Sequence, residues 1–286
     1  MKNLFLLAIT LFTLNSCEDP VDLSIEAGES QIVVDGFINN MDTAQVITLK
    51  QTKEFFGTTE QVPVLGATVK VTASDGSVYN FLDLNSNGNY TWEDSVLAHV
   101  NLSYALSIQY DSEIYTAEEL ANPVLIIDSL VVAPIEDGFT GQLSPDEFFV
   151  ELFAFDIAGR TDFYWIKVFR NDSLDLRPNA INVAYDAAFG PGTDGALLIP
   201  PIRESRLNDR ERAYLSGEKV KVEVWSINEN TYLFLNSIRN QINNGGLFAV
   251  PPSNVRTNIQ SSSTQTAKTA VGFFSVSLVR SIVVNI

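Results

Sequence analysis

The sequence predicts a mainly β protein, with two tandem antiparallel β-sandwich domains behind a short apolar N-terminal segment. Apolar and polar residues alternate with period two through much of the chain, and clusters of Gly, Asn and Asp separate the alternating stretches. Only one stretch has convincing helical spacing. At 45% hydrophobic residues with 18 Phe among 286, the chain has enough apolar material for two packed cores.

The N-terminal segment has the composition of a cleaved signal peptide. One positive charge precedes a mostly apolar run over residues 4–12, which is too short to span a bilayer as a helix. Leu14 and Ser16 stand before Cys17, the only cysteine, in a spacing that resembles the bacterial lipobox. The sequence therefore predicts a lipoprotein signal peptide over residues 1–16 and a covalent lipid on Cys17. The alternative is an ordinary cleaved signal that leaves a free thiol.

Residues 17–30 are predicted to form a tether, because small and polar residues dominate them. Glu18 and Asp19 directly follow the cysteine and resemble the export tag of lipoproteins that are displayed on the outer face of the outer membrane. We therefore expect a lipid-anchored protein that is exposed on the cell surface. The formal net charge of −17 argues against nucleic acid as a partner and against peripheral binding to anionic lipid.

An N-terminal β-sandwich is predicted over residues 31–122. Residues 67–72 and 102–109 alternate apolar and polar side chains, as half-buried antiparallel strands do. Between them, Ser74-Asp75-Gly76-Ser77 has the composition of a hairpin turn. Short strands at this spacing predict a sandwich of roughly 90 residues. The order of its strands and turns is similar to Ig-like or prealbumin-like domains of bacterial surface proteins.

A C-terminal β-rich domain is predicted over residues 123–286, because Asn122-Pro123 precedes a new apolar segment. Residues 148–155 and 163–169 are apolar on both faces, which predicts central strands covered on both sides. Residues 219–224 alternate and should have one solvated face. The stretch 271–284 is predicted to be a closing strand or strand pair.

One helix is predicted near residues 228–243, and a second, shorter helix over residues 204–214. Ser226 and Glu229 have capping-box spacing. The helix should end at Asn244-Gly245-Gly246. Its apolar stripe has helical periodicity and consists of Phe234, Leu235, Ile238 and Ile242.

The loop from Asp83 to Asp94 is the weak candidate for a metal site, with calcium as the ion. Asp83, Asn85 and Asn87 occupy the first, third and fifth positions of a calcium loop, Gly88 the sixth and Asp94 the twelfth. Only one of the first three is charged, and an Asp at the last position is shorter than the usual bidentate Glu. Asn and Gly are also typical of a plain β-turn. We expect no metal and no cofactor other than the covalent lipid.

No motif predicts an enzyme. Ser216 and Lys219 have the S-x-x-K spacing of penicillin-binding enzymes, but Ser216-Gly217 is typical of a turn into a strand rather than of a helix. Residues 190–195 match G-x-G-x-x-G without a preceding strand or a following helix. His99, the only histidine, stands in no motif. A hydrolase with an unrecognised carboxylate pair stays open, because Asp and Glu are plentiful.

The aromatic residues allow two interpretations. They are core residues, or they line a face that binds sugar or a partner protein. The residues concerned are Trp92, Trp165, Trp225, Tyr164 and Tyr232. The loops over residues 172–203 and 243–262 are the predicted positions of an exposed binding surface.

Several segments together resemble domain-of-unknown-function family 4249. They include residues 32–38, 64–69, 162–166 and 220–227, and the most specific is Pro251-Pro252-Ser253-Asn254. The likeness covers nearly the whole chain after the signal peptide. It implies an outer-membrane lipoprotein that is often encoded beside a TonB-dependent transporter, with no assigned catalytic residues.

The predicted function is that of a non-enzymatic outer-membrane lipoprotein. The resemblance implies a TonB-dependent β-barrel as its partner, for which the chain would act as an accessory or substrate-capturing protein. The alternative is a surface adhesin that binds glycan or protein on its own.

Overall fold

The computed structural model describes residues 30–52, 61–94, 97–136, 143–177, 180–185, 194–198, 202, 207–208, 212–245, 255–262 and 269–286. The predicted signal peptide, Cys17 and all of the tether except Ser30 lie outside these residues. So does most of the predicted helix over 204–214 and of the 190–195 motif.

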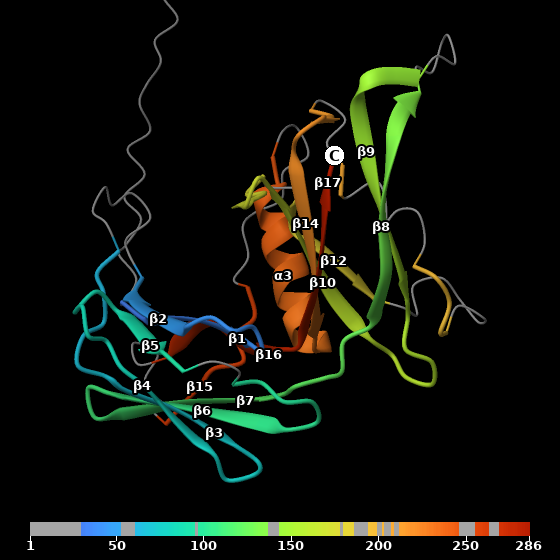
Figure 1. Cartoon of the computed structure of the whole chain (residues 1–286). Coiled ribbons are helices and arrows are strands. Elements are labelled where there is room, and N and C mark those ends of the chain that lie inside the picture. The colour runs from blue at the N-terminus through green and yellow to red at the C-terminus, as the bar shows by residue number, and fades with distance from the viewer. Residues whose placement is uncertain are drawn as a thin grey trace, which may run out of the picture.

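The mainly β fold is confirmed, with several antiparallel sheets and, within the described ranges, one long helix (Figure 1). In the N-terminal unit two sheets face each other. The first has the order β16 (Ala270–Ser277), β1 (Ile32–Asn39), β2 (Gln45–Gln51) and β5 (Asn89–Trp92). The second has the order β15 (Gln260–Ser261), β7 (Glu113–Leu120), β6 (Ser103–Tyr110), β3 (Thr68–Ala73) and β4 (Val78–Phe81).

Buried and exposed side chains alternate along each strand of this unit, so one face of each sheet supplies the core. On β7, Tyr115 and Ala117 are buried, whereas Thr116 and Glu118 are exposed. The inner faces of both sheets form one apolar cluster. Its fully buried large side chains include Phe81, Tyr90, Tyr104 and Phe274.

The C-terminal unit also has two sheets around a core. The first has the order β11 (Ser173–Leu174), β10 (Phe163–Arg170), β14 (Lys219–Ile227) and β17 (Val279–Asn285), with β12 (Asn182–Tyr185) also paired to β10. The second consists of β13 (Tyr214–Leu215), β9 (Leu143–Phe155) and β8 (Ile126–Glu136). Val150, Leu152, Ile166 and Val222 lie in the shared core.

The prediction that residues 148–155 are covered on both faces is wrong for β9. Val150, Leu152 and Ala154 are buried, but Phe155 on the opposite face is 52% exposed. Phe149 and Phe153 on the same face are half-buried. By contrast, both faces of β10 are covered. Ile166 lies in the sandwich core, and Trp165 packs on the opposite face against a separate apolar cluster that includes Trp225 and Phe234. Only β10 therefore matches the expectation.

The C-terminal end of the chain completes the N-terminal unit. β16 pairs parallel to β1 over its whole length, from Ile32 with Ala270 to Asn39 with Ser277. β15 pairs with β7. After Leu278 the chain continues directly as β17 in the sheet of the other unit. The predicted closing pair over 271–284 exists, but its two strands belong to different sheets.

The predicted helix near 228–243 is α3 (Glu229–Ile242), and it packs between the two units. Phe234 and Leu235 are buried, whereas Ile242 is exposed. The predicted capping box is wrong, because Ser226 belongs to β14 and its hydroxyl donates to the Asn122 carbonyl at 2.8 Å. Asn228 is the N-cap, without a side-chain capping bond. In the described part of the chain no helix has the length and apolar character to cross a membrane.

Candidate functional site

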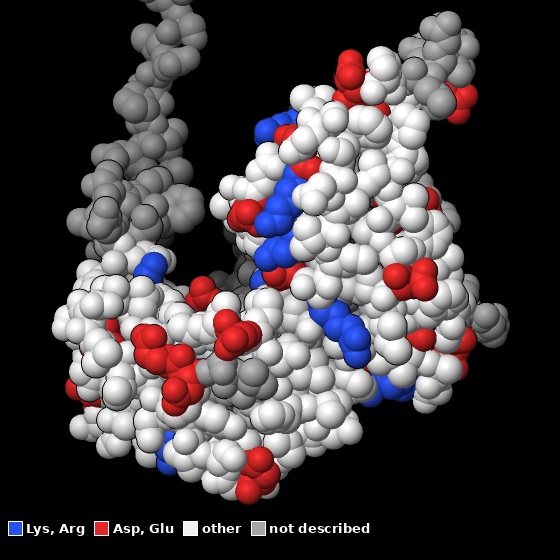
Figure 2. Space-filling view, viewed as in Figure 1, with Lys and Arg blue, Asp and Glu red and all other residues white. Residues whose placement is uncertain are grey.

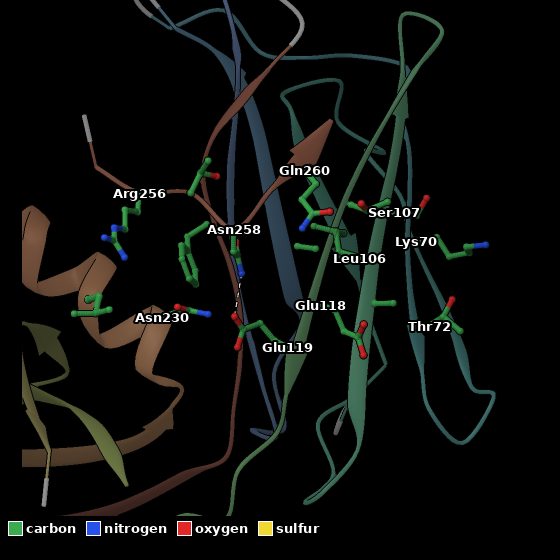
Figure 3. A pocket seen from close by; sticks show the side chains of 16 residues that line it. Lys70, Thr72, Leu106, Ser107, Glu118, Glu119, Asn230, Arg256, Asn258 and Gln260 are labelled. Carbon is green, nitrogen blue, oxygen red and sulfur yellow. Dashed lines mark hydrogen bonds between the residues drawn. The ribbon is translucent and has the colours of Figure 1, made fainter. Parts of the chain in front are cut away.

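A polar groove of 680 Å³ lies where the second N-terminal sheet meets α3. Outward-facing side chains of β3, β6 and β7, among them Lys70, Ser107 and Glu118, form one wall (Figure 3). Asn230 of α3 and Arg256 lie on the opposite wall. Hydroxyls, amides and charges of both signs therefore converge on one concavity between the units, an arrangement typical of a binding site.

Glu119 is the buried acid of this groove. Its side chain is only 5% exposed, and it accepts hydrogen bonds from the amide groups of Asn228 and of Asn258, the latter at 3.0 Å. Burial raises the pKa of the Glu119 carboxyl from 4.5 to about 7, although both amides act to lower it. The carboxyl therefore changes its charge near neutral pH.

Asn258 connects this acid to the neighbouring sheet. Its amide nitrogen donates to the Phe274 carbonyl at 2.7 Å, and its amide oxygen accepts from the Phe274 N–H at 3.0 Å. The side chain thus satisfies both backbone groups of Phe274 on the outer edge of β16, as a paired strand would. This contact holds the segment that ends in β15 across the open side of the sandwich.

A chain of amides fixes the groove between the two units. Asn228 donates to the Leu120 carbonyl at 3.1 Å and accepts from the amide of Asn122. Asn122 in turn accepts from Arg160 at 3.0 Å, and Arg160 pairs with buried Asp162 at 2.7 Å. The residue predicted as the domain boundary is therefore a hydrogen-bonded junction.

The calcium candidate is a tight turn between β4 and β5. The Asp83 carboxylate accepts from the backbone N–H groups of Asn87 at 3.1 Å and Gly88 at 2.9 Å. Gly88 has φ +79°, as the turn interpretation requires. Asn85 and Asp94 make no hydrogen bond to this turn. No group of three His, Cys, Asp or Glu side chains in the described ranges is placed to hold a metal ion.

Two of the candidate aromatics are cross-strand neighbours on the face of the C-terminal sheet that packs toward α3. The rings of Trp165 and Trp225 lie 5.8 Å apart, and the Lys167 Nζ lies 3.8 and 3.4 Å from their centroids. Burial lowers the pKa of Lys167 to about 8, opposed by Glu223 and Asp35. Figure 2 shows Lys and Arg side chains along the C-terminal unit beside the hollow between the units.

The other candidate aromatics are also packed internally. Tyr164 is buried and donates to Asp156 at 2.6 Å. Trp92 packs edge-on against Tyr79, and Tyr232 lies against Phe163. Because their neighbours already cover these rings, the aromatics support the core interpretation better than an open binding face.

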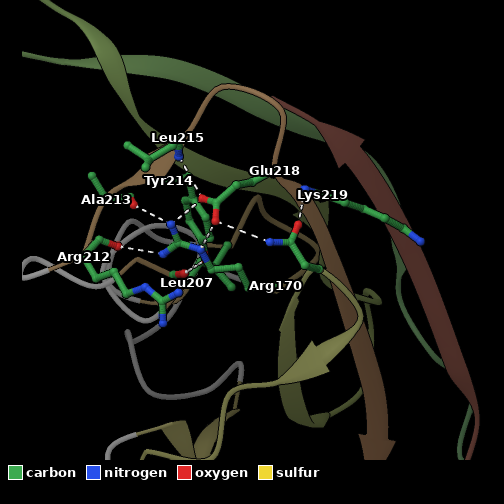
Figure 4. A network of polar contacts seen from close by, with 9 residues as sticks. Arg170, Leu207, Arg212, Ala213, Tyr214, Leu215, Glu218 and Lys219 are labelled. Atoms are coloured by element: carbon green, nitrogen blue, oxygen red, sulfur yellow. Dashed lines mark hydrogen bonds and ion pairs between the residues drawn. The ribbon is translucent and has the colours of Figure 1, made fainter.

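A second pocket, of 470 Å³, lies at the far end of the C-terminal unit. Arg170 there pairs with Glu218 and donates to the carbonyls of Arg212 and Ala213 (Figure 4). Arg177 pairs with Asp175. Since two of its three arginines already bind carboxylates, this pocket has little charge left for an anion. Lys219 of the S-x-x-K motif pairs with Asp172 at 2.8 Å.

Sequence reasoning identified part of the groove. The predicted binding loop over 243–262 supplies Arg256, Asn258 and Gln260. The sequence patterns did not predict that Glu118 and Glu119 belong to the groove, because both residues lie within a strand. One signal was available, because Glu119 is in register with inward-facing residues of β7 and so occupies a core position.

The chain was compared with models of protein families and with curated proteins. A family model described as Domain of unknown function (DUF4249) matches residues 18–282. No curated protein matches the chain.

Proposed function

The chain belongs to the DUF4249 family, whose description assigns no activity, and from this premise we propose that it is a non-enzymatic outer-membrane lipoprotein. In this proposal Cys17 carries the lipid anchor, and the folded units present the polar groove to a partner or its cargo. The partner is a TonB-dependent β-barrel transporter, for which the chain acts as an accessory, substrate-capturing protein.

The anchor is supported by the order of the N-terminal features. An apolar run, a small residue, a single cysteine and two acidic residues follow one another within 19 residues. Residues 18–29 separate the cysteine from the first described residue and would span about 40 Å when extended. This tether is long enough for the body to reach a neighbouring barrel in the same membrane.

The single observation that carries the binding role is the groove between the units. It is concave and polar, and its buried acid is held by amides from both sides of the junction. Polar groups that converge in this way orient a ligand.

The experiment is purification of the full chain from its native membrane in mild detergent, followed by mass spectrometry of whatever accompanies it. We expect lipid on Cys17 and a stoichiometric TonB-dependent barrel. The Cys17→Ser variant should leave the membrane fraction. Recovery of the lipidated protein alone would reject the transporter partnership and favour the stand-alone adhesin, and recovery without lipid would reject the anchor.

A further inference from the structure

The outer edge of β7 has backbone groups that point into the groove. Along this strand the N–H and C=O of successive residues point to opposite sides. Ala121 exchanges hydrogen bonds with the β6 side, through Leu102 and Asn101. Ile114 faces the other side, where its carbonyl accepts from Ser262. Even-numbered residues of β7, including Glu118, therefore direct their backbone groups away from β6.

β15 covers only the first part of this edge. It pairs with Tyr115 and Thr116 and then ends, because Asn258 turns toward β16 and bonds to Phe274. Further along, the Leu120 carbonyl accepts from the Asn228 side chain. Between these two points, the backbone N–H and C=O of Glu118 have no partner among the residues that the structure describes.

The sheet has a vacant position beside Glu118. One row across its outer face runs through Lys70, Ser107, Thr116 and Gln260, with a residue from each of four strands. The next row runs through Thr72, Ala105 and Glu118, and none of the described residues pairs with Glu118 as the fourth strand would. All of these residues line the groove, so the vacant position opens into it (Figure 3).

We propose that the groove binds an extended peptide segment, which adds to the edge of β7 beyond β15. This inference rests on the proposed binding role of the groove and names its ligand class. The peptide backbone would pair with the N–H and C=O of Glu118, as in other complexes formed by strand addition. The side chain opposite Glu118 would be basic, since opposite charges stabilise cross-strand pairs.

Neighbouring groups keep this position available. Glu119 and Phe274 together hold the Asn258 side chain, which draws the incoming chain away from the edge of β7. Leu233 of α3 lies on the far side of the groove, where it could contact apolar side chains that flank the basic residue. The expected ligand therefore alternates apolar and polar residues around a Lys or Arg.

The test uses the purified full chain and the pentapeptide Thr-Val-Lys-Val-Thr-amide with a fluorophore on its N-terminal amine, with binding measured by anisotropy. In an antiparallel pair that continues the register of β15, Lys would exchange both backbone hydrogen bonds with Glu118. One control peptide therefore carries an N-methyl group on the backbone nitrogen of Lys, and the other has Glu in place of Lys. We expect the parent peptide to bind at least about tenfold more tightly than either control. Hydrogen exchange at residues 113–121 should slow when the parent peptide binds.

Two pairs of variants distinguish backbone pairing from general effects on the fold. Glu118→Pro removes the outward N–H and should abolish binding, whereas Glu118→Gln keeps the backbone and should weaken it only modestly. Ser107→Trp should block the groove, and Gln109→Trp, on the same strand and face but outside the groove, should bind normally.

The outcomes separate this inference from the proposed function. Equal affinity for the N-methylated peptide, or normal binding by both Glu118→Pro and Ser107→Trp, would overturn strand addition even if a barrel accompanies the native protein. No binding of the parent peptide by the wild-type chain would overturn it as well. Peptide binding without any accompanying barrel would support strand addition while rejecting the transporter partnership.

Discussion

Glu119 has an environment that disfavours the charged form of its side chain. A carboxyl that is 5% exposed has lost most of its hydration, and two side-chain amides only partly replace that hydration. No cation forms an ion pair with it among the described residues. Its raised pKa follows directly from this imbalance.

The raised pKa of Glu119 predicts a pH-dependent stability. Between about pH 4.5 and 7 the native state holds a proton that the unfolded state has released. The contribution of Glu119 to the free energy of unfolding is therefore complete below pH 4.5 and is lost as the pH rises through 7. The total loss is on the order of 3 kcal/mol. Urea denaturation of wild type and Glu119→Gln at pH 4.5, 6 and 8 should show this fall in the wild type alone.

Glu118→Gln is the matched control for that measurement. It removes an exposed carboxylate from the adjacent position of the same strand, so its free energy of unfolding should follow the wild-type pH profile. If the wild-type and Glu119→Gln profiles are parallel from pH 4.5 to 8, the assigned titration of Glu119 is wrong.

Asn258→Asp tests the bridge between the groove and β16. The new carboxylate can still accept from the Phe274 N–H, but it can donate neither to the Phe274 carbonyl nor to Glu119, and it adds a like charge beside that acid. We expect a loss of about 2–4 kcal/mol at pH 8 in thermal or urea denaturation. The loss should be smaller at pH 4.5, where the carboxyls become neutral.

Asn80→Asp provides the comparison, because Asn80 is exposed on β4. The same chemical change there should alter the free energy of unfolding by less than about 0.5 kcal/mol. Similar losses in both variants would indicate a general effect of added negative charge, contrary to the assigned bridge.

At the scale of elements, the pairing of β1 with β16 depends on one glycine. Gly272 has φ +92°, and a Cβ added to it would lie 2.0 Å from the Val34 carbonyl oxygen on the neighbouring strand. Both the backbone conformation and the close approach therefore require glycine at this position. The strand that completes the N-terminal unit tolerates no side chain there.

Gly272→Ala should cost at least about 3 kcal/mol, because backbone strain and a steric clash add together. Gly76→Ala separates these two causes. Gly76 also has φ +92°, but an added Cβ would meet no atom within 4 Å, so we expect a loss of about 1 kcal/mol from strain alone. Equal losses in chemical denaturation would show that the close contact with Val34 has no energetic consequence.

At the scale of the molecule, local patterns predicted the strands but not all of their partners. Alternation and turn composition indicated the sandwiches, the helix and the closing pair. These local patterns did not indicate that β16 lies beside β1. The two strands pair in parallel, and their paired residues are more than 230 positions apart in the sequence. The groove was only partly predictable for the same reason, since its walls come from β3, β6, β7, α3 and the segment before β15.

The two units should therefore not separate at the junction predicted from sequence. A fragment of residues 30–122 lacks Ile259, Phe274 and Val276, which are buried in the N-terminal core. Each such side chain contributes about 1.5–3 kcal/mol, and a domain of this size has only about 5–15 kcal/mol of net stability. We expect this fragment to show no cooperative thermal transition and no dispersed amide resonances.

A single chain that joins residues 30–122 to residues 255–277 should restore the fold. Hydrogen bonds link Asn122 to Asn228, Asn228 to Glu119 and Glu119 to Asn258, so a flexible linker of about twelve Gly and Ser residues can connect the two segments. We expect a cooperative melt and dispersed resonances from this chain. The Gly272→Ala version should lose both, because it breaks the pairing of β16 with β1. A cooperative melt from residues 30–122 alone would instead show that the first half of the chain forms a stable sandwich without its C-terminal strands.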